Sequence, residues 1–407
     1  MSMKDRVLSL LFKGWAGSAF LILLTVLLLL LVGIVFVYSS ADNMSSSFPG
    51  PYSLSQIKKV ILGILTMLAI SCVPPRILEK VAPVFFGATI LLLVGLFAYK
   101  LAVGGVVRWI RIPGFQFQPS ELAKISTVMM LATLLRGGLG QSRWNQVLSI
   151  LTCAAMPFLL IAAQPDVGTA MILVPTVVAM IWVAHLSKRR LMLLFLCSVA
   201  LVGASWYTPL VRDYHKSRIA TYLGLEEGSW TQTLLGLDQV SIVRPSSYQI
   251  DQSLIALASG GPMGKGLHMG RHHDLGYLPE DHNDFIFAVI GEEWGLQGTL
   301  LVVTGFLLLG FTILGVAWTS RDHFGRLVAV GIATQLVSQS LVNQAVVTEL
   351  LPVTGLTLPF ISYGGTSIVV SLWGIGLVLS IARHPVEVSH PDGLRGSSSP
   401  IKNRLLR

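Results

Sequence analysis

Residues 14–41 read GWAGSAFLILLTVLLLLLVGIVFVYSSA and contain no charged side chain. A helix needs about 20 apolar residues to cross the hydrocarbon core of a bilayer, so this stretch is long enough to span it. Lys4, Arg6 and Lys13 precede the run, and Ser39-Ser40-Ala41 resembles a signal-peptide cleavage site. Because the apolar run is too long for the central region of a signal peptide, we expect a retained first transmembrane helix.

Similar apolar runs recur along the whole chain. Of its 407 residues, 53% are hydrophobic and only 12% are charged, whereas soluble globular domains carry about 25% charged residues. This composition excludes a soluble domain and intrinsic disorder. No alternating pattern of strand length indicates a barrel, so backbone groups in lipid must be satisfied within helices. The sequence predicts an all-α polytopic integral membrane protein with ten transmembrane helices at about 14–41, 60–75, 81–99, 119–136, 144–165, 167–187, 191–211, 295–320, 327–348 and 350–382.

The loops between these spans differ in charge. With ten spans both termini lie on one side, and that side holds 17 of the 29 Lys and Arg residues. Six of the other 12 lie in the long loop at 211–284, which the positive-inside rule does not count, so the short loops divide 17 to 6. We therefore expect both termini in the cytoplasm. The net charge of +9 follows from this topology and gives no evidence of nucleic-acid binding.

The chain is predicted to form a single membrane domain over residues 1–407. Residues 211–284 form a large extracytoplasmic loop within it, and loops of this length are usually functional or disordered. This loop keeps apolar patterning and then becomes glycine-rich, so we expect it to be ordered. Residues 385–407 form a flexible cytoplasmic tail.

Charged residues at membrane depth are costly and are therefore candidates for function. Glu121 and Lys124 lie i, i+3 on one face of a predicted helix, where they form either a structural ion pair or the wall of a polar pocket. Asp166 directly precedes a predicted helix, so we expect it to be a helix cap.

A second group of polar residues lies where the long loop re-enters the bilayer, in the stretch LPEDHNDFIF at 278–287. A carboxylate at that boundary is partly desolvated, which suits Asp284 to act as a general base, although it could instead cap a helix. Glu280 and Asp281 are expected to be solvated. The histidines of the loop show no zinc-binding motif, so no metal site is predicted.

Basic residues on the outer side oppose the positive-inside trend. Arg108, beside Trp109, suits an anionic lipid headgroup at the interface, or it simply anchors the chain there. Lys265 lies in Gly264-Lys265-Gly266, which lacks the spacing of a Walker loop and is expected to form tight turns whose N–H groups face an anion. Together the residues describe a polar cavity, open to the outside, for chemistry on an anionic lipid or for its transport.

Several motifs together resemble the SEDS family of peptidoglycan polymerases, to which RodA, FtsW and SpoVE belong. They occur in the family's order between about residues 15 and 383, and the blocks at 289–293 and 355–360 are closer to the FtsW division type. The motifs are VRWI at 107–110, FQPSELAK at 117–124, QPDVGTA at 164–170, QSLIA at 252–256 with SGG at 259–261, LPE at 278–280 through DFIFA at 284–288, and LPFISYGG at 358–365.

The resemblance implies ten spans in the bacterial inner (cytoplasmic) membrane and transfer of lipid II to a growing glycan, for cell division or elongation. It places the catalytic carboxylate at Asp284. The departing undecaprenyl pyrophosphate must be stabilised by positive charge. A divalent cation, Mg²⁺ or Mn²⁺, is a candidate to supply part of that charge. The residues expected to contact substrate are Arg108, Trp109, Glu121, Lys124, Arg218, Lys265, His282, Ser362 and Tyr363.

The resemblance also implies partners, namely a class B penicillin-binding protein and other membrane proteins of the divisome or elongasome. An alternative function is a lipid II flippase, which would use the same cavity without bond formation. Flippases usually need broken helices and repeat symmetry, and the sequence shows neither. A third reading is a scaffold that only recruits a transpeptidase.

Overall fold

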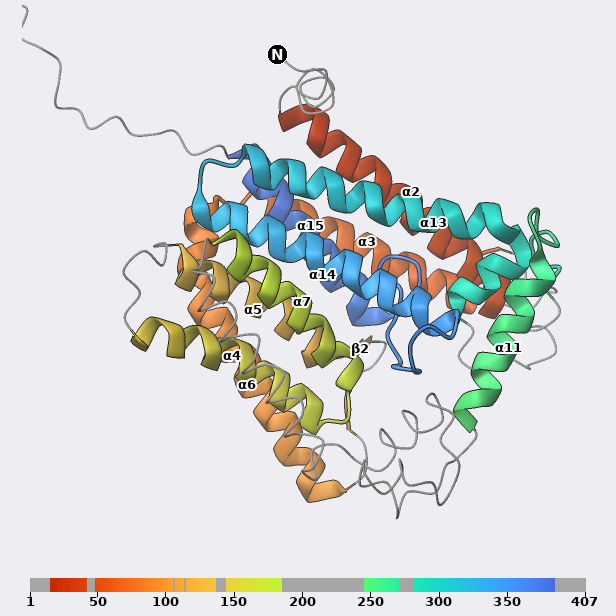
Figure 1. Cartoon of the computed structure of the whole chain (residues 1–407), viewed down its shortest axis with the longest axis horizontal. Helices are drawn as coiled ribbons and strands as arrows, with labels where there is room; N and C mark the ends of the chain where they lie inside the picture. The colour runs from red at the N-terminus through yellow and green to blue at the C-terminus, as the bar shows by residue number, and fades with distance from the viewer. Residues whose placement is uncertain are drawn as a thin grey trace, which may run out of the picture.

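The computed structural model describes residues 15–41, 48–104, 107–112, 115–136, 144–184, 245–270 and 282–384. This part of the chain forms a helical bundle (Figure 1). Its helices are α2 (Trp15–Ala41), α3 (Pro51–Ser71), α4 (Pro75–Val103), α5 (Pro119–Leu135), α6 (Trp144–Ala163), α7 (Val167–Val183), α11 (Pro245–Gly260), α13 (Ile286–Thr319), α14 (His323–Val347) and α15 (Gly365–Arg383).

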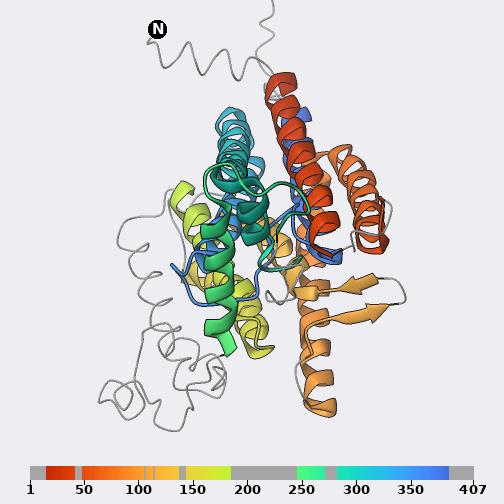
Figure 2. The same ribbon diagram turned by 90° about the vertical axis from the view of Figure 1, so that its right-hand side faces the viewer.

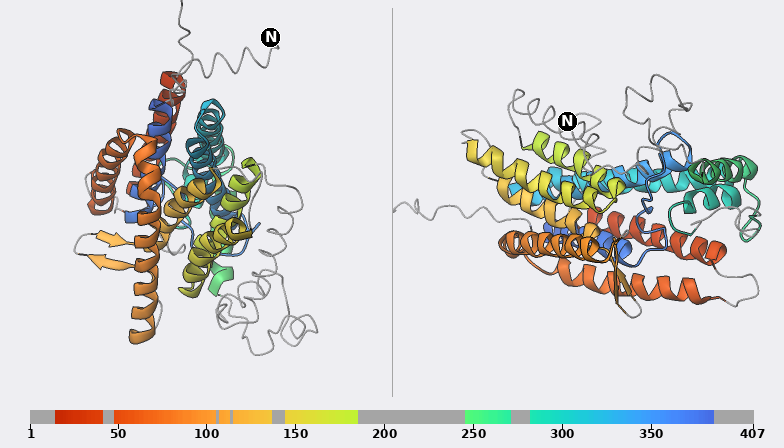
Figure 3. Two further views of the ribbon diagram at one scale, coloured as in Figure 1. Left: turned by 90° about the vertical axis from the view of Figure 1, so that its left-hand side faces the viewer. Right: turned by 90° about the horizontal axis from the view of Figure 1, so that it is seen from below.

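Among the described residues, six helices are long and apolar enough to cross a membrane, namely α2, α3, α4, α13, α14 and α15. The apolar helices α6 and α7 are shorter. The right-hand view of Figure 3 shows the long helices running in roughly one direction, as expected for a multi-pass membrane protein. The predicted span at 191–211 and the tail at 385–407 lie outside the described residues, so the count of ten stays a prediction. Of the long loop at 211–284, the described residues form α11 and the turns that follow it.

The described part of the chain is mostly helical, in agreement with the expected all-α class, and two local elements differ from the predicted spans. Residues 110–117 form an antiparallel hairpin of β1 (Ile110–Ile112) and β2 (Phe115–Phe117), with Arg111 opposite Gln116. Figure 2 shows this hairpin projecting beside α4. In addition, the apolar stretch at 350–382 is not one span, because α15 begins at Gly365 and residues 352–364 form turns and extended chain. Pro352 and Pro359 explain why this stretch does not continue as a helix.

Helix α13 is broken at Gly295, where φ is 64° and ψ is −155°. The break frees backbone groups that must find partners elsewhere. The turn after α11 supplies them: the N–H of Leu296 donates to the Gly261 carbonyl at 2.9 Å, and the Glu292 carbonyl accepts from the N–H of Lys265 at 3.0 Å. The sequence expectation that no helix is broken is therefore wrong. The predicted span at 295–320 begins at this break.

The first and last parts of the chain pack against each other along α3 and α15. Trp373 donates through Nε1 to Thr66 Oγ1 at 2.9 Å, and the Gln56 amide donates to the carbonyl of Ser362 at 3.2 Å. At the far end, the Ser380 hydroxyl donates to the carbonyl of Val73 at 2.5 Å. The core between the helices is apolar, whereas polar loops gather at the end of the bundle that holds the hairpin and residues 352–364.

Candidate active site

A cavity of about 690 Å³ opens at the polar end of the bundle. Five separate parts of the chain build it: α3, the hairpin with the start of α5, the start of α7, the turn before α13, and the segment that leads into α15. Its lining residues are Ser55, Lys59, Arg108, Trp109, Gln116, Gln118, Glu121, Asp166, Thr169, Asn283, Asp284, Gly355, Leu356, Thr357, Tyr363, Gly364, Gly365 and Ser367.

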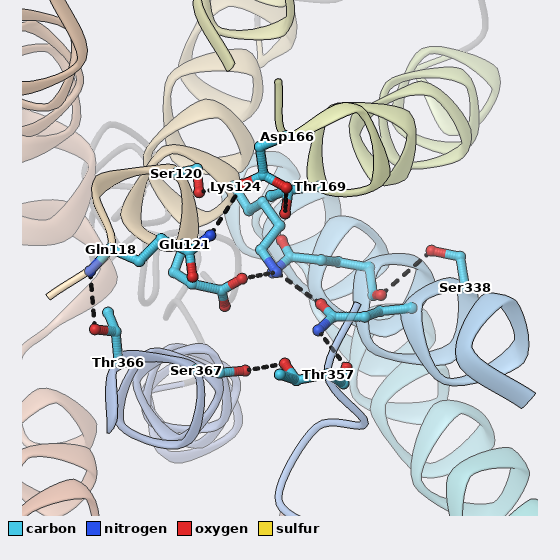
Figure 4. Close-up of polar contacts among 12 residues, drawn as sticks. Gln118, Ser120, Glu121, Lys124, Asp166, Thr169, Ser338, Thr357, Thr366 and Ser367 are labelled. Atoms are coloured by element: carbon cyan, nitrogen blue, oxygen red, sulfur yellow. Dashed lines mark hydrogen bonds and ion pairs between the residues drawn. The ribbon is translucent and has the colours of Figure 1, made fainter. Parts of the chain in front are cut away.

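The floor of the cavity is a buried ion pair on α5. Lys124 Nζ lies 2.8 Å from Glu121 Oε1, and the two residues are 1% and 4% exposed. The same ammonium donates to Gln339 Oε1 of α14 at 2.7 Å, and the amide of Gln339 donates to the carbonyl of Thr357 at 2.9 Å (Figure 4). The pairing predicted from the i, i+3 spacing is present. It ties α5 to α14 and to the segment before α15.

Asp166 links α7 to the start of α5 beside this pair. It occupies the cap position of α7, but its carboxylate accepts no hydrogen bond from the backbone of that helix. Instead Oδ2 accepts from Gln118 Nε2 at 2.9 Å and from the Ser120 hydroxyl at 3.0 Å, and Oδ1 accepts from the Thr169 hydroxyl at 2.9 Å (Figure 4). The expected cap is thus a buried connector of α5 and α7, and it lines the cavity.

Asp284 faces the cavity from the turn before α13. The cap position of that helix is Phe285, so Asp284 does not occupy it. Asn343 of α14 fixes the turn, because its amide donates to the carbonyls of Asp284 and Leu356, both at 2.7 Å. Gly355 lies opposite with φ at 71°, and a Cβ there would be 3.4 Å from Asp284 Oδ2. The missing side chain leaves room next to the carboxylate.

Aromatic rings form the wall on the side of α3. Tyr363 packs against the rings of Tyr52 and His282, with centroids 5.5 Å and 5.6 Å away. Lys59 places its Nζ 3.8 Å from the centroid of the Tyr363 ring and lines the cavity. Lys59 was not among the residues expected from the sequence to contact substrate. Like Arg108, it is a basic residue in a segment that the charge distribution predicts to lie outside, so the same signal could have found it.

The structure brings together some of the predicted substrate-binding residues. Asp284, Arg108, Trp109, Glu121 and Tyr363 line the cavity, Lys124 lies behind Glu121, and His282 backs Tyr363. The geometry therefore gathers residues from four of the motifs around one space.

Ser362 and Lys265 have other contacts. The Ser362 hydroxyl accepts from the N–H of Leu358 at 2.7 Å, so it holds the turn that carries Tyr363. Lys265 Nζ pairs with Glu292 Oε1 at 2.6 Å, and the N–H groups at 264–266 donate to backbone carbonyls, so the expected anion-facing turn is wrong. Arg218 lies outside the described residues.

The donor groups of the cavity offer no ready-made cation site. Glu121, Asp166 and Asp284 all line it, yet the first pairs with Lys124 and the second accepts from three side chains. Among the described residues, no group of three His, Cys, Asp or Glu side chains is arranged to hold a metal ion. These residues do not fit the candidate divalent cation, and no step is assigned to one.

Comparison with known proteins identifies the family. The sequence matches the cell cycle protein family of FtsW, RodA and SpoVE over residues 19–387. The chain belongs to this family. It is 34% identical over 361 residues to the peptidoglycan glycosyltransferase MrdB of Escherichia coli K12, covering 88% of this chain and 93% of MrdB. It is also 34% identical over 382 residues to the probable peptidoglycan glycosyltransferase FtsW of Geobacter sp. M18, covering 90% and 97% of the two chains.

Solved structures of the FtsW, RodA and SpoVE family share this fold. RodA of Thermus thermophilus superposes with a TM-score of 0.61 at 25% identity, covering 90% of this chain and 97% of RodA. A chain from a peptidoglycan synthase complex that coordinates polymerization and crosslinking gives a TM-score of 0.69 at 27% identity, covering 90% and 98%. Since the identities to MrdB and FtsW are equal, the preference for the division type stays a prediction.

Proposed function

We propose that this protein is a peptidoglycan glycosyltransferase of the bacterial cytoplasmic membrane that polymerises lipid II into glycan strands. The observation that carries the proposal is a cavity in which the carboxylate of Asp284 shares one space with the cationic side chains of Arg108 and Lys59. Transfer from a lipid pyrophosphate needs a base at the acceptor and positive charge at the leaving group. The family relatives named as peptidoglycan glycosyltransferases support the same reaction.

In the proposed step, Asp284 accepts the proton of the GlcNAc 4-hydroxyl of the acceptor. The oxygen forms a bond to C1 of the donor MurNAc, and the bond from C1 to the pyrophosphate oxygen breaks with inversion. The electron pair leaves with undecaprenyl pyrophosphate, whose charge Arg108 and Lys59 offset. The ring of Tyr363, backed by His282, gives the acceptor sugar an apolar face to pack on.

The buried polar groups below the cavity position these residues. Lys124 and Glu121 connect α5 to Thr357 through Gln339, while Asp166 fixes the start of α7. Polar groups in such networks are costly to leave unpaired, so the network favours one arrangement of the cavity wall. We assign these side chains to positioning and reserve the proton transfer for Asp284.

Polymerisation by the purified full-length protein tests the proposal. Incubation with lipid II in nanodiscs, alone and with candidate class B penicillin-binding proteins, should give glycan chains on a denaturing gel. Asp284→Asn should abolish the product because an amide cannot accept the proton, whereas Asp281→Asn should keep most activity. Near-normal polymerisation by the folded Asp284→Asn variant would disprove the role of this carboxylate.

The membrane orientation belongs to the same proposal. Six basic residues lie at the helix ends and connections opposite the cavity, namely Arg76, Lys80, Arg136, Arg321, Arg326 and Arg383. By the positive-inside rule, that end and both termini lie in the cytoplasm and the cavity opens outward, where lipid II is consumed. Labelling of the Asn283→Cys variant by a membrane-impermeant thiol reagent, compared with labelling of native Cys72, would test this orientation.

The broken helix α13 favours a second candidate function. Discontinuous helices are typical of transporters, so the break at Gly295 is compatible with a lipid II flippase. The two functions differ in product: a flippase moves lipid II between the leaflets of a liposome without making glycan. Transport by the Asp284→Asn variant together with no polymerisation by the unmodified protein would favour the flippase.

A further inference from the structure

The first part of α13 is a short helical segment set off from the rest of the helix. Residues 286–294, called the half-helix below, run from the turn that carries Asp284 to the break at Gly295. At the rise of an α-helix, this segment is about 14 Å long. Figure 1 shows α11 beside this part of α13. Because the backbone at Gly295 is not helical, the direction of the half-helix depends on contacts other than those of the remaining helix.

Two consecutive glutamates fasten the end of the half-helix that lies next to the break. Glu293 is 0% exposed, and its carboxylate accepts from the Ser39 hydroxyl at 2.6 Å and from the N–H of His268 at 3.2 Å. Glu292 is 1% exposed and pairs with Lys265 Nζ at 2.6 Å. These side chains connect the half-helix to the last turn of α2 and to the turn that follows α11.

The turn after α11 also touches the half-helix through its backbone. The N–H of Gly266 donates to the carbonyl of Glu293 at 2.9 Å. Gly264 has φ at 77°, and a Cβ built on it would lie 2.1 Å from the same carbonyl oxygen, so a larger residue would push the turn away. The ring of Tyr38 on α2 packs edge-on against the ring of His268, with centroids 4.8 Å apart. The turn is therefore held between α2 and the half-helix.

The hydrogen bonds of Glu293 depend on two distant segments at once. Ser39 and His268 are 229 residues apart in sequence, and the N–H of His268 donates to the Ser39 hydroxyl as well as to the Glu293 carboxylate, both at 3.2 Å. Burial of a carboxylate is costly unless hydrogen bonds compensate for the lost water. Both donors are in place only when α2, the turn and the half-helix take one arrangement, so Glu293 favours that arrangement.

We propose that Glu293 is a positioning residue that sets the place of the Asp284 carboxylate through the half-helix. The inference rests on the proposed function and assigns a second residue to it. A rotation of the half-helix by about 10° at the break would move its far end by about 2 Å. Misplacement of a reacting group by 1 Å can lower a rate by about a hundredfold. The turn after α11 belongs to the long loop at 211–284, so this loop and the catalytic carboxylate are mechanically connected.

Polymerisation kinetics of the full-length protein in nanodiscs test this role. Glu293→Ala should lower kcat at least about tenfold and leave KM for lipid II unchanged, because Arg108 and Lys59 lie on other elements. Glu293→Gln should restore most of kcat, since an amide can accept from the N–H of His268 and donate to the Ser39 hydroxyl. Ser39→Ala keeps the carboxylate and should lower kcat in the same way, which tests the link even if Glu293→Ala does not fold.

Thr312→Ala is the matched control. Thr312 is a buried polar residue of α13 beyond the break, and its hydroxyl donates to carbonyls of its own helix, those of Leu308 and Leu309. This variant should keep its kcat. Normal kcat in both Glu293→Ala and Ser39→Ala, or losses as large in Thr312→Ala or in Glu293→Gln as in Glu293→Ala, would overturn the proposal.

Electron paramagnetic resonance reports the position of the half-helix without any need for polymerisation. Spin labels at Asn283→Cys and His323→Cys, in a full-length protein whose three native cysteines are replaced, give the distance from the turn to the start of α14. Glu293→Ala should shift or broaden this distance by about 2 Å, and Thr312→Ala should not. An unchanged distance in Glu293→Ala would overturn the proposal even if activity fell. A shifted distance in a protein that makes no glycan would refute the proposed function and leave the link between Glu293 and the half-helix standing.

Discussion

Neutralising one member of the Glu121–Lys124 pair should destabilise the protein severely. In Glu121→Gln the ammonium of Lys124 stays 1% exposed and keeps only neutral acceptors, chiefly Gln339 at 2.7 Å. Breaking a buried ion pair in this way costs roughly 3–5 kcal/mol, because the remaining charge is neither solvated nor paired. Whole domains are stable by only about 5–15 kcal/mol, so one such change removes a large share of the total.

The double variant Glu121→Gln/Lys124→Met distinguishes a buried pair from two unrelated losses. Removing both charges leaves no unpaired ion, so it should cost less than the more severe single variant. Reversible unfolding of the detergent-solubilised protein, followed by intrinsic tryptophan fluorescence, would give the loss in free energy of unfolding for the two single variants and for the double variant. Residues that do not interact give additive losses, and the departure from additivity measures the pair.

An exposed ion pair in the same protein provides the control. Arg136, directly after the last residue of α5, bonds to Glu79 of α4 at 2.5 Å, with side chains 52% and 17% exposed. Pairs of this kind contribute about 0–1 kcal/mol, so Arg136→Gln should be nearly silent. If Glu121→Gln were as mild as Arg136→Gln, or if the losses of the two single variants added up in the double variant, the buried pair would not contribute in the way described.

Three further predictions concern the cavity, the turn after α11 and the partner. Lys59→Ala should lower the rate of polymerisation several-fold because it removes a cation from the cavity, whereas Lys58→Ala, on the exposed side of α3, should not. Gly260→Ala should destabilise the protein, since its Cβ would lie 1.9 Å from a carbonyl oxygen of α13; Gly87→Ala, which meets nothing, should be neutral, and equal melting temperatures would contradict the close packing. A class B penicillin-binding protein should slow hydrogen exchange across residues 211–284 and raise the polymerisation rate together; unchanged exchange with full activity in its absence would show that the loop is already ordered.

Local patterns predicted the parts of the site that depend on neighbours in sequence. The spacing of Glu121 and Lys124 was enough to place them on one helix face, and the structure pairs them at 2.8 Å. The hairpin also has a local signal: Ile110 to Phe117 alternates apolar and polar residues around Pro113-Gly114, a dipeptide typical of turns. Hydropathy, which separates the apolar spans from the loops, does not reveal such a short alternation.

Contacts between distant segments could not be predicted in this way. Asp166 was expected to cap its own helix, but its partners Gln118 and Ser120 lie at the start of another helix, and no local pattern indicates them. The break at Gly295 likewise depends on the turn that follows α11, which satisfies the freed backbone groups. A charge-free apolar run only shows that a segment is compatible with lipid, and it does not show where the helix stops.

The pairing of α3 with α15 sets the order in which the protein can mature. Gln56 emerges from the ribosome 306 residues before Ser362, whose carbonyl accepts from its amide. At about 5–20 residues per second, the amide waits roughly 15–60 s for this partner. During that interval α3 presents polar groups at membrane depth that water, lipid headgroups or an insertase must satisfy. Tyr363 completes the cavity wall in the same late event, so a nascent chain cannot act on substrate before its synthesis is almost finished.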